Sequence, residues 1–219
     1  MLYSLEINIL KIQRTSEVNI VKKEGNNENT RDRIIRIASD IIKDKGFKNT
    51  TVKDICLACD ISKRTFYYHI NSKDDIILEY YDKIIDDITP LLMQMLSTNN
   101  YWEQIVLIFN NLITSMESLG PDINAQLLSI NLQGNKNIFD MRQDLADVAI
   151  NIIEEAQQIN QVRNKNKASD LYRSAAYMFT GYEYMWCVRD GDFPWRQQLL
   201  SSLETIFDVD PELRKYSES

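Results

Sequence analysis

The sequence predicts an all-α protein, with a three-helix helix-turn-helix domain followed by a larger helical domain. Only 6 Gly and 4 Pro stand among the 219 residues, too few for the many tight turns of a β-sandwich or barrel. Apolar residues recur at three-to-four spacing in several segments, as they do on one face of a helix. A hydrophobic content of 44% supplies enough apolar surface for real cores.

Composition and charge predict a cytoplasmic protein without a membrane span. Three cysteines, and no N-terminal apolar run with a small-residue cleavage site, indicate a reducing compartment. No apolar stretch approaches the roughly 18 uninterrupted residues of a membrane span. The net charge of −7 would repel nucleic acid, but it is unevenly distributed. Residues 30–80 carry 10 basic against 8 acidic side chains, whereas residues 81–219 carry 11 against 20.

Residues 1–29 are expected to form a poorly ordered N-terminal extension. A short alternating piece from Leu5 to Ile9 is followed by a polar tract at 22–29, and neither supplies a core of its own. An added strand or a basic arm is the alternative for this segment.

Two helices with clear end signals are predicted next. Thr30 is placed to cap the first, whose apolar residues recur at three-to-four spacing, and Gly46 supplies a left-handed stop. Thr51 is placed to cap the second, with Asp54 three residues on as its capping-box partner. This second helix is expected to end by residue 60.

A third helix is predicted after the turn at 60–62, with Ser62 as its N-cap. It is basic and aromatic, and with the second helix it forms a helix-turn-helix pattern. Phe66 and Ile70 lie four residues apart and are expected to face the core. The alternative is that a flanking tyrosine joins Phe66 there. The side chains expected to point outward are Tyr67, Tyr68 and His69.

The Cys56-x-x-Cys59 pair on the second helix is predicted to be packing rather than a metal or redox site. Small residues suit a helix that packs tightly against a neighbour, and Cys acts there as a small hydrophobe. A closed zinc site needs four ligands, and the chain offers only Cys187 and His69 in addition. No metal and no cofactor are therefore expected.

Three motifs run through the predicted helix-turn-helix: Gly46-Phe47-x-x-Thr50-Thr51-Val52-x-Asp54-Ile55, Ile61-Ser62-Lys63-x-Thr65-Phe66-Tyr67-Tyr68-His69 and Ser72-Lys73-x-Asp75. Together they resemble the DNA-binding domain of TetR-family transcriptional regulators. The rest of the chain resembles that family only in length and helical texture. The resemblance implies a DNA-binding domain at 30–76 and a ligand-binding and dimerisation domain at 77–219.

The resemblance also implies a homodimer that reads a palindromic double-stranded DNA operator and releases it when a small-molecule effector fills the C-terminal domain. Carried over by motif position, Thr51 and Lys73 would hold phosphates. Asp60 stands where the family usually has Gly in the turn, and Asp tolerates the left-handed conformation. The side chains implied to face DNA are Ser62, Lys63, Arg64, Thr65, Tyr67, Tyr68 and His69.

Arg64 is the candidate base reader on the third helix. It stands where the family commonly has a small residue, and a guanidinium can donate a bidentate pair to guanine O6 and N7. A contact to phosphate alone is the alternative, and both stay open.

The C-terminal residues are expected to form further helices. A helix that begins near Lys73 should run to Pro90, which kinks it or ends it. Gly, Pro and Asn place loops at 120–121, 131–137, 164–167 and 191–194. The helices between these loops are predicted at 102–116, 122–130, 138–158, 168–188 and 195–207.

The predicted helix 168–188 is apolar nearly all round in its second half, which indicates burial on more than one side. With the final helix it is the predicted dimer interface. Its lone late charge, Glu183, is predicted to line a pocket for a cationic or hydroxylated ligand with Phe179, Trp186 and Trp102. An interfacial salt bridge or a carboxylate at the solvent edge is the alternative.

The sequence therefore predicts a ligand-responsive DNA-binding regulator, most simply a repressor. An activator, or a factor of the same fold that recruits a partner protein and has no small-molecule pocket, is the alternative. An enzyme is not expected, because the chain has no Gly-rich phosphate loop, no Gly-x-Ser-x-Gly and no second His beside His69. No catalytic residue is assigned.

Overall fold

The structure is a computed structural model, and it describes residues 29–85, 89–98, 100–134 and 143–217. Residues 1–28 of the predicted N-terminal extension lie outside these ranges. Helices form nearly all of the regular structure in the described residues, with one isolated bridge between Val162 and Val209. The elements are α2 Thr30–Lys45, α3 Val52–Ala58, α4 Lys63–His69, α5 Lys73–Ile85, α6 Thr89–Leu96, α7 Tyr101–Leu119, α8 Pro121–Gly134, α9 Gln143–Gln158, α10 Ala168–Val188, α11 Trp195–Ile206 and a 3-10 turn, Pro211–Leu213.

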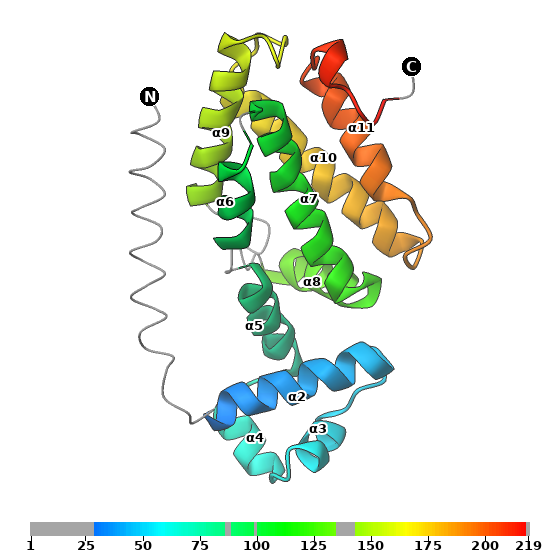
Figure 1. The fold of residues 1–219 in the computed structure, drawn as a ribbon. Coiled ribbons are helices and arrows are strands. Elements are labelled where there is room, and N and C mark those ends of the chain that lie inside the picture. Colours follow the sequence, from blue (N-terminus) through cyan, green and yellow to red (C-terminus); the bar gives the residue numbers. More distant parts are fainter. Residues whose placement is uncertain (1–28, 86–88, 99, 135–142, 218–219) are drawn as a thin grey trace.

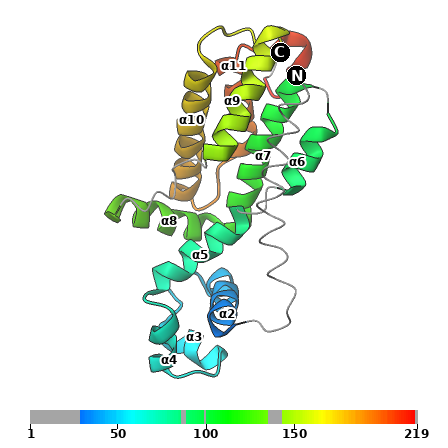
Figure 2. The same ribbon diagram turned by 90° about the vertical axis from the view of Figure 1, so that its left-hand side faces the viewer.

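The helices gather at two ends of the molecule, joined by α5 (Figure 1). Helices α2, α3 and α4 form the smaller end, and α7, α9, α10 and α11 form a bundle at the larger one. Helix α8 lies across the end of that bundle which faces α2, and it also contacts α5 (Figure 2). The proposed domain boundary after residue 76 falls within α5.

The ends of α2 follow local capping chemistry, with one correction to the sequence prediction. The N-cap is Asn29, whose side chain accepts a hydrogen bond from the Asp32 backbone N–H at 2.9 Å, so Thr30 is already helical. Asn is among the strongest N-cap residues, and it precedes Thr30 by one position. The predicted stop is confirmed: Gly46 has φ 81°, and its N–H donates to the Ile42 carbonyl at 2.8 Å.

The helix-turn-helix forms as its caps predict. Thr51 and Asp54 close a capping box on α3, and the Ser62 hydroxyl accepts from the Thr65 N–H at 3.0 Å to begin α4. Asp60 takes the left-handed conformation in the turn, with φ 52°. The predicted packing role of the cysteine pair is confirmed, because Cys56 and Cys59 are both buried in the core that α2, α3 and α4 share.

The larger end matches the predicted helices closely, with differences at their ends. Helix α10 spans the predicted residues. Helix α5 ends at Ile85, and the next described helix, α6, begins at Thr89 with Pro90 in its first turn. The predicted loop 131–137 is wrong in its first half, because α8 continues to Gly134. Once Ile130 anchors the helix in the core, another turn adds backbone hydrogen bonds at little entropic cost, even with Leu132 88% exposed. Residues 135–142 lie outside the described ranges.

Candidate nucleic-acid interface

Helix α4 presents a polar and aromatic surface while one face is buried. Phe66 and Ile70 are 0% and 1% exposed, as predicted, whereas Tyr67 is 53% and Tyr68 83% exposed. The Tyr67 ring lies edge-on to Phe66, with ring centroids 5.3 Å apart, so the core directs its orientation. Ser62, Lys63 and Arg64 are exposed and Thr65 is half-buried at the start of the same helix.

The C-terminal end of α4 is tied to two other helices. Arg31 on α2 donates from Nε to the His69 carbonyl at 3.1 Å, and its guanidinium also forms an ion pair with Glu79 on α5. His69 itself is half-buried, and its ring packs edge-on against Tyr68 with centroids 4.9 Å apart. The backbone at the C-terminal end of α4 is therefore held in place by α2 and α5. Tyr68 is the most exposed aromatic side chain on α4.

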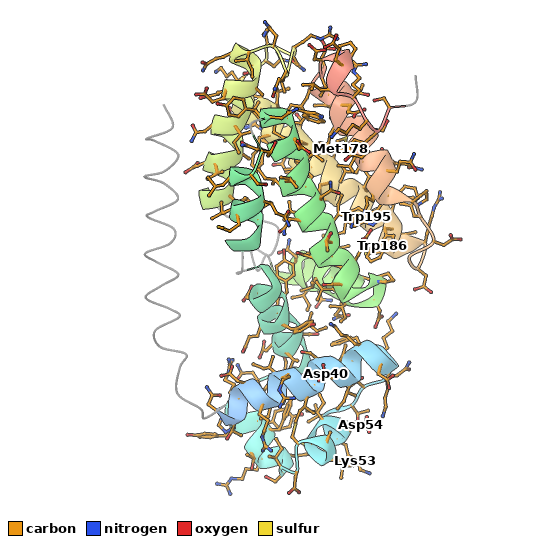
Figure 3. The ribbon with its side chains drawn as sticks, viewed as in Figure 1. Asp40, Lys53, Asp54, Met178, Trp186 and Trp195 are labelled. Atoms are coloured by element: carbon orange, nitrogen blue, oxygen red, sulfur yellow. The ribbon has the colours of Figure 1, made fainter. Side chains whose placement is uncertain are left out.

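The start of α3 lies in a basic neighbourhood that the sequence reasoning did not assign. Lys53 occupies the first turn, is exposed, and stands beside Asp54 (Figure 3). Hydrogen bonds from the Thr51 side chain and backbone lower the pKa of Asp54 against an opposing effect of burial, and the charges of Lys45 and Lys53 each lower it by less. The sequence feature that could have identified Lys53 is its position in the first turn of a helix, because the N-terminal end of a helix binds phosphate.

Lys73 is occupied inside the protein rather than extended into solvent. Its ammonium donates to the carbonyls of Phe47 and Thr50, the latter at 2.8 Å, and lies 3.7 Å from the centre of the Phe47 ring. Burial lowers the pKa of Lys73, while the charges of Asp74 and Asp122 oppose that shift. A phosphate contact through Lys73 stays a prediction, and such a contact would have to share these bonds.

The aromatic residues around Glu183 form a cluster that includes one ring the sequence reasoning missed. Trp195 packs against Phe179 and Trp186 with ring centroids 5.5 and 5.6 Å apart, and Figure 3 shows the two tryptophans side by side. The position of Trp195 in the first helical turn after the loop 191–194 was the only feature of the sequence that could have identified this residue. Trp102 lies on another helix, α7, and its ring packs against Phe207. No ring contact in the described residues joins Trp102 to this cluster.

Glu183 is a buried carboxylate in apolar surroundings. It is 1% exposed, and its Oε2 has no hydrogen-bond partner among the described residues. Burial raises the pKa of Glu183 to about 8. Burial, together with the nearby Glu183 charge, also raises the pKa of Tyr81 and raises that of Cys187 to about 12. Glu183 is thus not at the solvent edge of the protomer.

A separate hollow of about 460 Å³ opens on the surface between α10, α11 and the C-terminal tail, away from the predicted pocket residues. Its walls are uncharged and carry hydroxyl and amide groups. The hollow is lined by Tyr182, Pro194, Gln197, Gln198, Ser201, Ser202 and Tyr216.

Two classes of site are not found in the part of the chain that the structure describes. No three His, Cys, Asp or Glu side chains gather there to hold a metal ion. None of its helices combines the length and apolar character needed to cross a membrane. The helix-turn-helix of α3 and α4, with its exposed polar and aromatic side chains, defines instead the class of helix-turn-helix DNA-binding regulators, here with a further helical domain attached.

Comparison with known sequences supports this class. Residues 34–80 match the family described as bacterial regulatory proteins, tetR family. The uncharacterized HTH-type transcriptional regulator YvaF of Bacillus subtilis (strain 168) is 24% identical over 181 residues, which cover 81% of this chain and 91% of YvaF. The biofilm operon icaADBC HTH-type negative transcriptional regulator IcaR of Staphylococcus aureus (strain Newman) is 27% identical over 116 residues, which cover 52% of this chain and 62% of IcaR.

Solved structures share the fold. Thermus thermophilus FadR, a TetR-family transcriptional repressor in complex with lauroyl-CoA, superposes with a TM-score of 0.60 at 16% identity, covering 86% of this chain and 98% of FadR. AibR, in complex with isovaleryl coenzyme A and operator DNA, superposes with a TM-score of 0.53 at 18% identity, covering 83% of this chain and all of AibR. Residues 34–80 therefore match the tetR-family DNA-binding domain, and the chain as a whole shares its fold with solved TetR-family regulators.

Proposed function

We propose that this regulator is a repressor that binds a palindromic operator as a homodimer and leaves it when a small molecule binds the C-terminal helices. The observation that carries the proposal is the surface of α4, where polar, basic and aromatic side chains stand exposed on a helix capped at Ser62 and anchored by Phe66. Such a helix suits the major groove of DNA. IcaR, a relative over half of the chain, is named a negative regulator.

Within this surface, Arg64 is the proposed base reader and the start of α3 the proposed phosphate contact. Arg64 is exposed in the first turn of α4, the part of a recognition helix that contacts base edges. Thr51 and Lys53 lie at the start of α3, where backbone N–H groups and a positive charge favour phosphate. The remaining DNA-facing side chains are Ser62, Lys63, Thr65, Tyr67, Tyr68 and His69, with Lys73 as a second phosphate contact.

The proposed dimer interface is the outward face of α10 together with α11. Tyr177, Tyr184 and Val188 on α10 are 73%, 54% and 60% exposed, although soluble proteins seldom leave such a row of apolar side chains in water. Gly181 lies in the same row, and the space around its Cα is open, so another helix can approach closely. An isologous contact of this face with itself would cover the row.

The proposed effector binds among the C-terminal helices beside Glu183, Phe179 and Trp186. FadR and AibR are seen with acyl-CoA ligands, which supports an effector in the same domain without identifying it. For this chain, a buried carboxyl group whose Oε2 has no hydrogen-bond partner among the described residues, on the helix that carries Phe179 and Trp186, favours a cationic or hydroxylated compound. Trp102 stays a less supported member of this site, because its ring packs against Phe207.

The experiment that tests the repressor proposal is fluorescence-anisotropy titration of the full-length protein with DNA from upstream of its own gene. Excess unrelated DNA serves as competitor, near physiological salt. Arg64→Ala should weaken specific binding by about 1–3 kcal/mol, the range for one bidentate base contact. Arg163→Ala is the matched control, because Arg163 belongs to the loop between α9 and α10, at the end of the molecule away from α4 (Figure 1). Equal binding to upstream and random DNA would instead favour a recruiting role or an operator elsewhere.

A further inference from the structure

We propose that Asp122 on α8 is the positioning residue that holds the helix-turn-helix unit in its DNA-reading orientation against the C-terminal helices. This inference rests on the proposed DNA-binding function and adds the contact that sets the geometry of the reader. It starts from a hydrogen bond between residues 75 positions apart: the Phe47 backbone N–H donates to Asp122 Oδ2 at 2.6 Å.

The loop between α2 and α3 is held from two sides by side chains of other helices. Phe47 donates its N–H to Asp122 of α8 and accepts at its carbonyl from the Lys73 ammonium of α5. Both backbone groups of a single loop residue are thus bonded to charged side chains, and such bonds are stronger than neutral ones. Thr51, the N-cap of α3, lies four residues after Phe47, so the position of Phe47 sets where α3 begins.

The glycine that ends α2 turns the chain toward this contact. Gly46 has a positive φ of 81°, and a Cβ on it would be in ordinary van der Waals contact with Asp122 Oδ2, at 3.4 Å. Glycine is favoured here because it takes the left-handed conformation that places Phe47 next to Asp122.

Helix α8 is itself fixed in the C-terminal domain, so Asp122 is a firm attachment point. The Asn124 side-chain amide donates to the carbonyls of Met116 and Gly120 at 2.8 and 2.7 Å, and Leu127 is buried between α8 and its neighbours. A second bond, from Gln126 Nε2 to Asp74 Oδ1 at 3.0 Å, reaches α5 one helical turn beyond Asp122.

These contacts make α8, in addition to α5, a helix that touches both the helix-turn-helix unit and the C-terminal helices. Helix α8 packs against α10, which carries Glu183 (Figure 2). From its first two turns, Asp122 reaches the α2–α3 loop and Gln126 reaches α5. A dimeric reader depends on the spacing between its two recognition helices, so loss of one attachment should weaken operator binding without removing any DNA contact.

The test compares Asp122→Ala and Asp122→Asn with the wild-type full-length protein by hydrogen–deuterium exchange and by operator binding. Removing the charged acceptor should speed exchange at the Phe47 amide and weaken operator binding by roughly tenfold each in the Ala variant. The Asn variant, which keeps an acceptor oxygen, should fall between Ala and wild type. Glu154→Ala, an exposed carboxylate on α9, should change neither quantity.

The outcomes separate this inference from the proposed function. Unchanged exchange at Phe47, or faster exchange with wild-type operator affinity, overturns the role of Asp122 while leaving DNA binding intact. Wild-type protein that selects no DNA overturns the proposed function itself, whatever the exchange shows. Thermal unfolding of each variant identifies a general loss of folding, and the Asn variant, which keeps the size of the side chain, then decides the result.

Discussion

At the scale of single residues, Glu183 departs furthest from what its surroundings favour. Its carboxyl group is 1% exposed on α10, and no cation is paired with it in the described residues. An ionised carboxylate in that position would carry a large desolvation cost, so the folded protein keeps the proton instead. A group that is costly for stability at this position among the C-terminal helices agrees with the proposed role of Glu183 in binding an effector.

The first prediction concerns the pH dependence of stability. Folded Glu183 has a pKa raised to about 8, whereas the ordinary value is 4.5. Stability from the protonated group is therefore fully present below about pH 4.5 and is lost as pH rises toward 8, at most roughly 1.4 kcal/mol per pH unit. Glu183→Gln cannot ionise. Its unfolding free energy relative to wild type should therefore rise by up to about 4 kcal/mol from pH 5 to pH 8.

Urea unfolding of both proteins at several pH values and one fixed protein concentration measures this difference. Glu154→Gln, which makes the same chemical change at an exposed glutamate on α9, is the control. Parallel pH profiles for wild type and Glu183→Gln would mean that Glu183 is ionised in the folded protein, and would remove the physical basis for a neutral buried acid.

At the scale of elements, residues 215–217 of the C-terminal tail are hydrogen-bonded to one carboxylate of α11. Glu204 is fully buried and accepts hydrogen bonds from the backbone N–H groups of Lys215, Tyr216 and Ser217, at 2.6, 3.0 and 2.6 Å, and from the Ser217 hydroxyl. Burial alone would raise the pKa of Glu204, but the bonds from Ser217, Lys215 and Tyr216 outweigh it and the pKa is lowered. The tail thus acts as a cap for a buried charge.

We predict that a chain ending at Arg214 is destabilised through Glu204. Loss of the tail donors strands a buried carboxylate, at a cost of about 1–3 kcal/mol. Glu204→Gln in the truncated chain should cost less than the sum of the two separate changes, because the two alterations remove the same bonds. Because the folded pKa is lowered, the tail's contribution should be present above about pH 4.5 and lost as pH falls below it. Additive losses in denaturant unfolding would contradict this coupling.

Elements were predictable where local chemistry decides them. The caps at Thr51 and Ser62 and the full span of α10 followed from residues within a few positions of one another. The candidate site was predictable in part: exposure of Tyr67 and Tyr68 followed from the burial of Phe66, but Asp122 did not follow. Its partner Phe47 is 75 residues away, and no periodicity or cap signal encodes which loop meets α8.

At the scale of the whole molecule, charge is divided between the two ends. The reader segment 30–80 has slightly more basic than acidic side chains, while residues 81–219 hold the acidic excess behind the net charge of −7. DNA is attracted to the end that carries residues 30–80 and repelled from the other end, so the electrostatic field of the protein orients it on the duplex. In the proposed homodimer, two DNA-binding domains meet one duplex, so the two chains have to join away from the DNA, at the end that carries α10 and α11.

The last prediction tests that assembly. Tyr184→Arg places a charge in the exposed apolar row of α10, and in a two-fold interface the same charge appears twice. Light scattering should show a dimer for wild type and a monomer for the variant, and operator affinity should fall because one reader alone keeps only half of the contacts. Leu132→Arg on α8, at a site 88% exposed and outside this row, is the control and should remain dimeric. If Tyr184→Arg stays a dimer with unchanged operator affinity, the two chains meet through another face, and the exposed row on α10 must then serve a different partner.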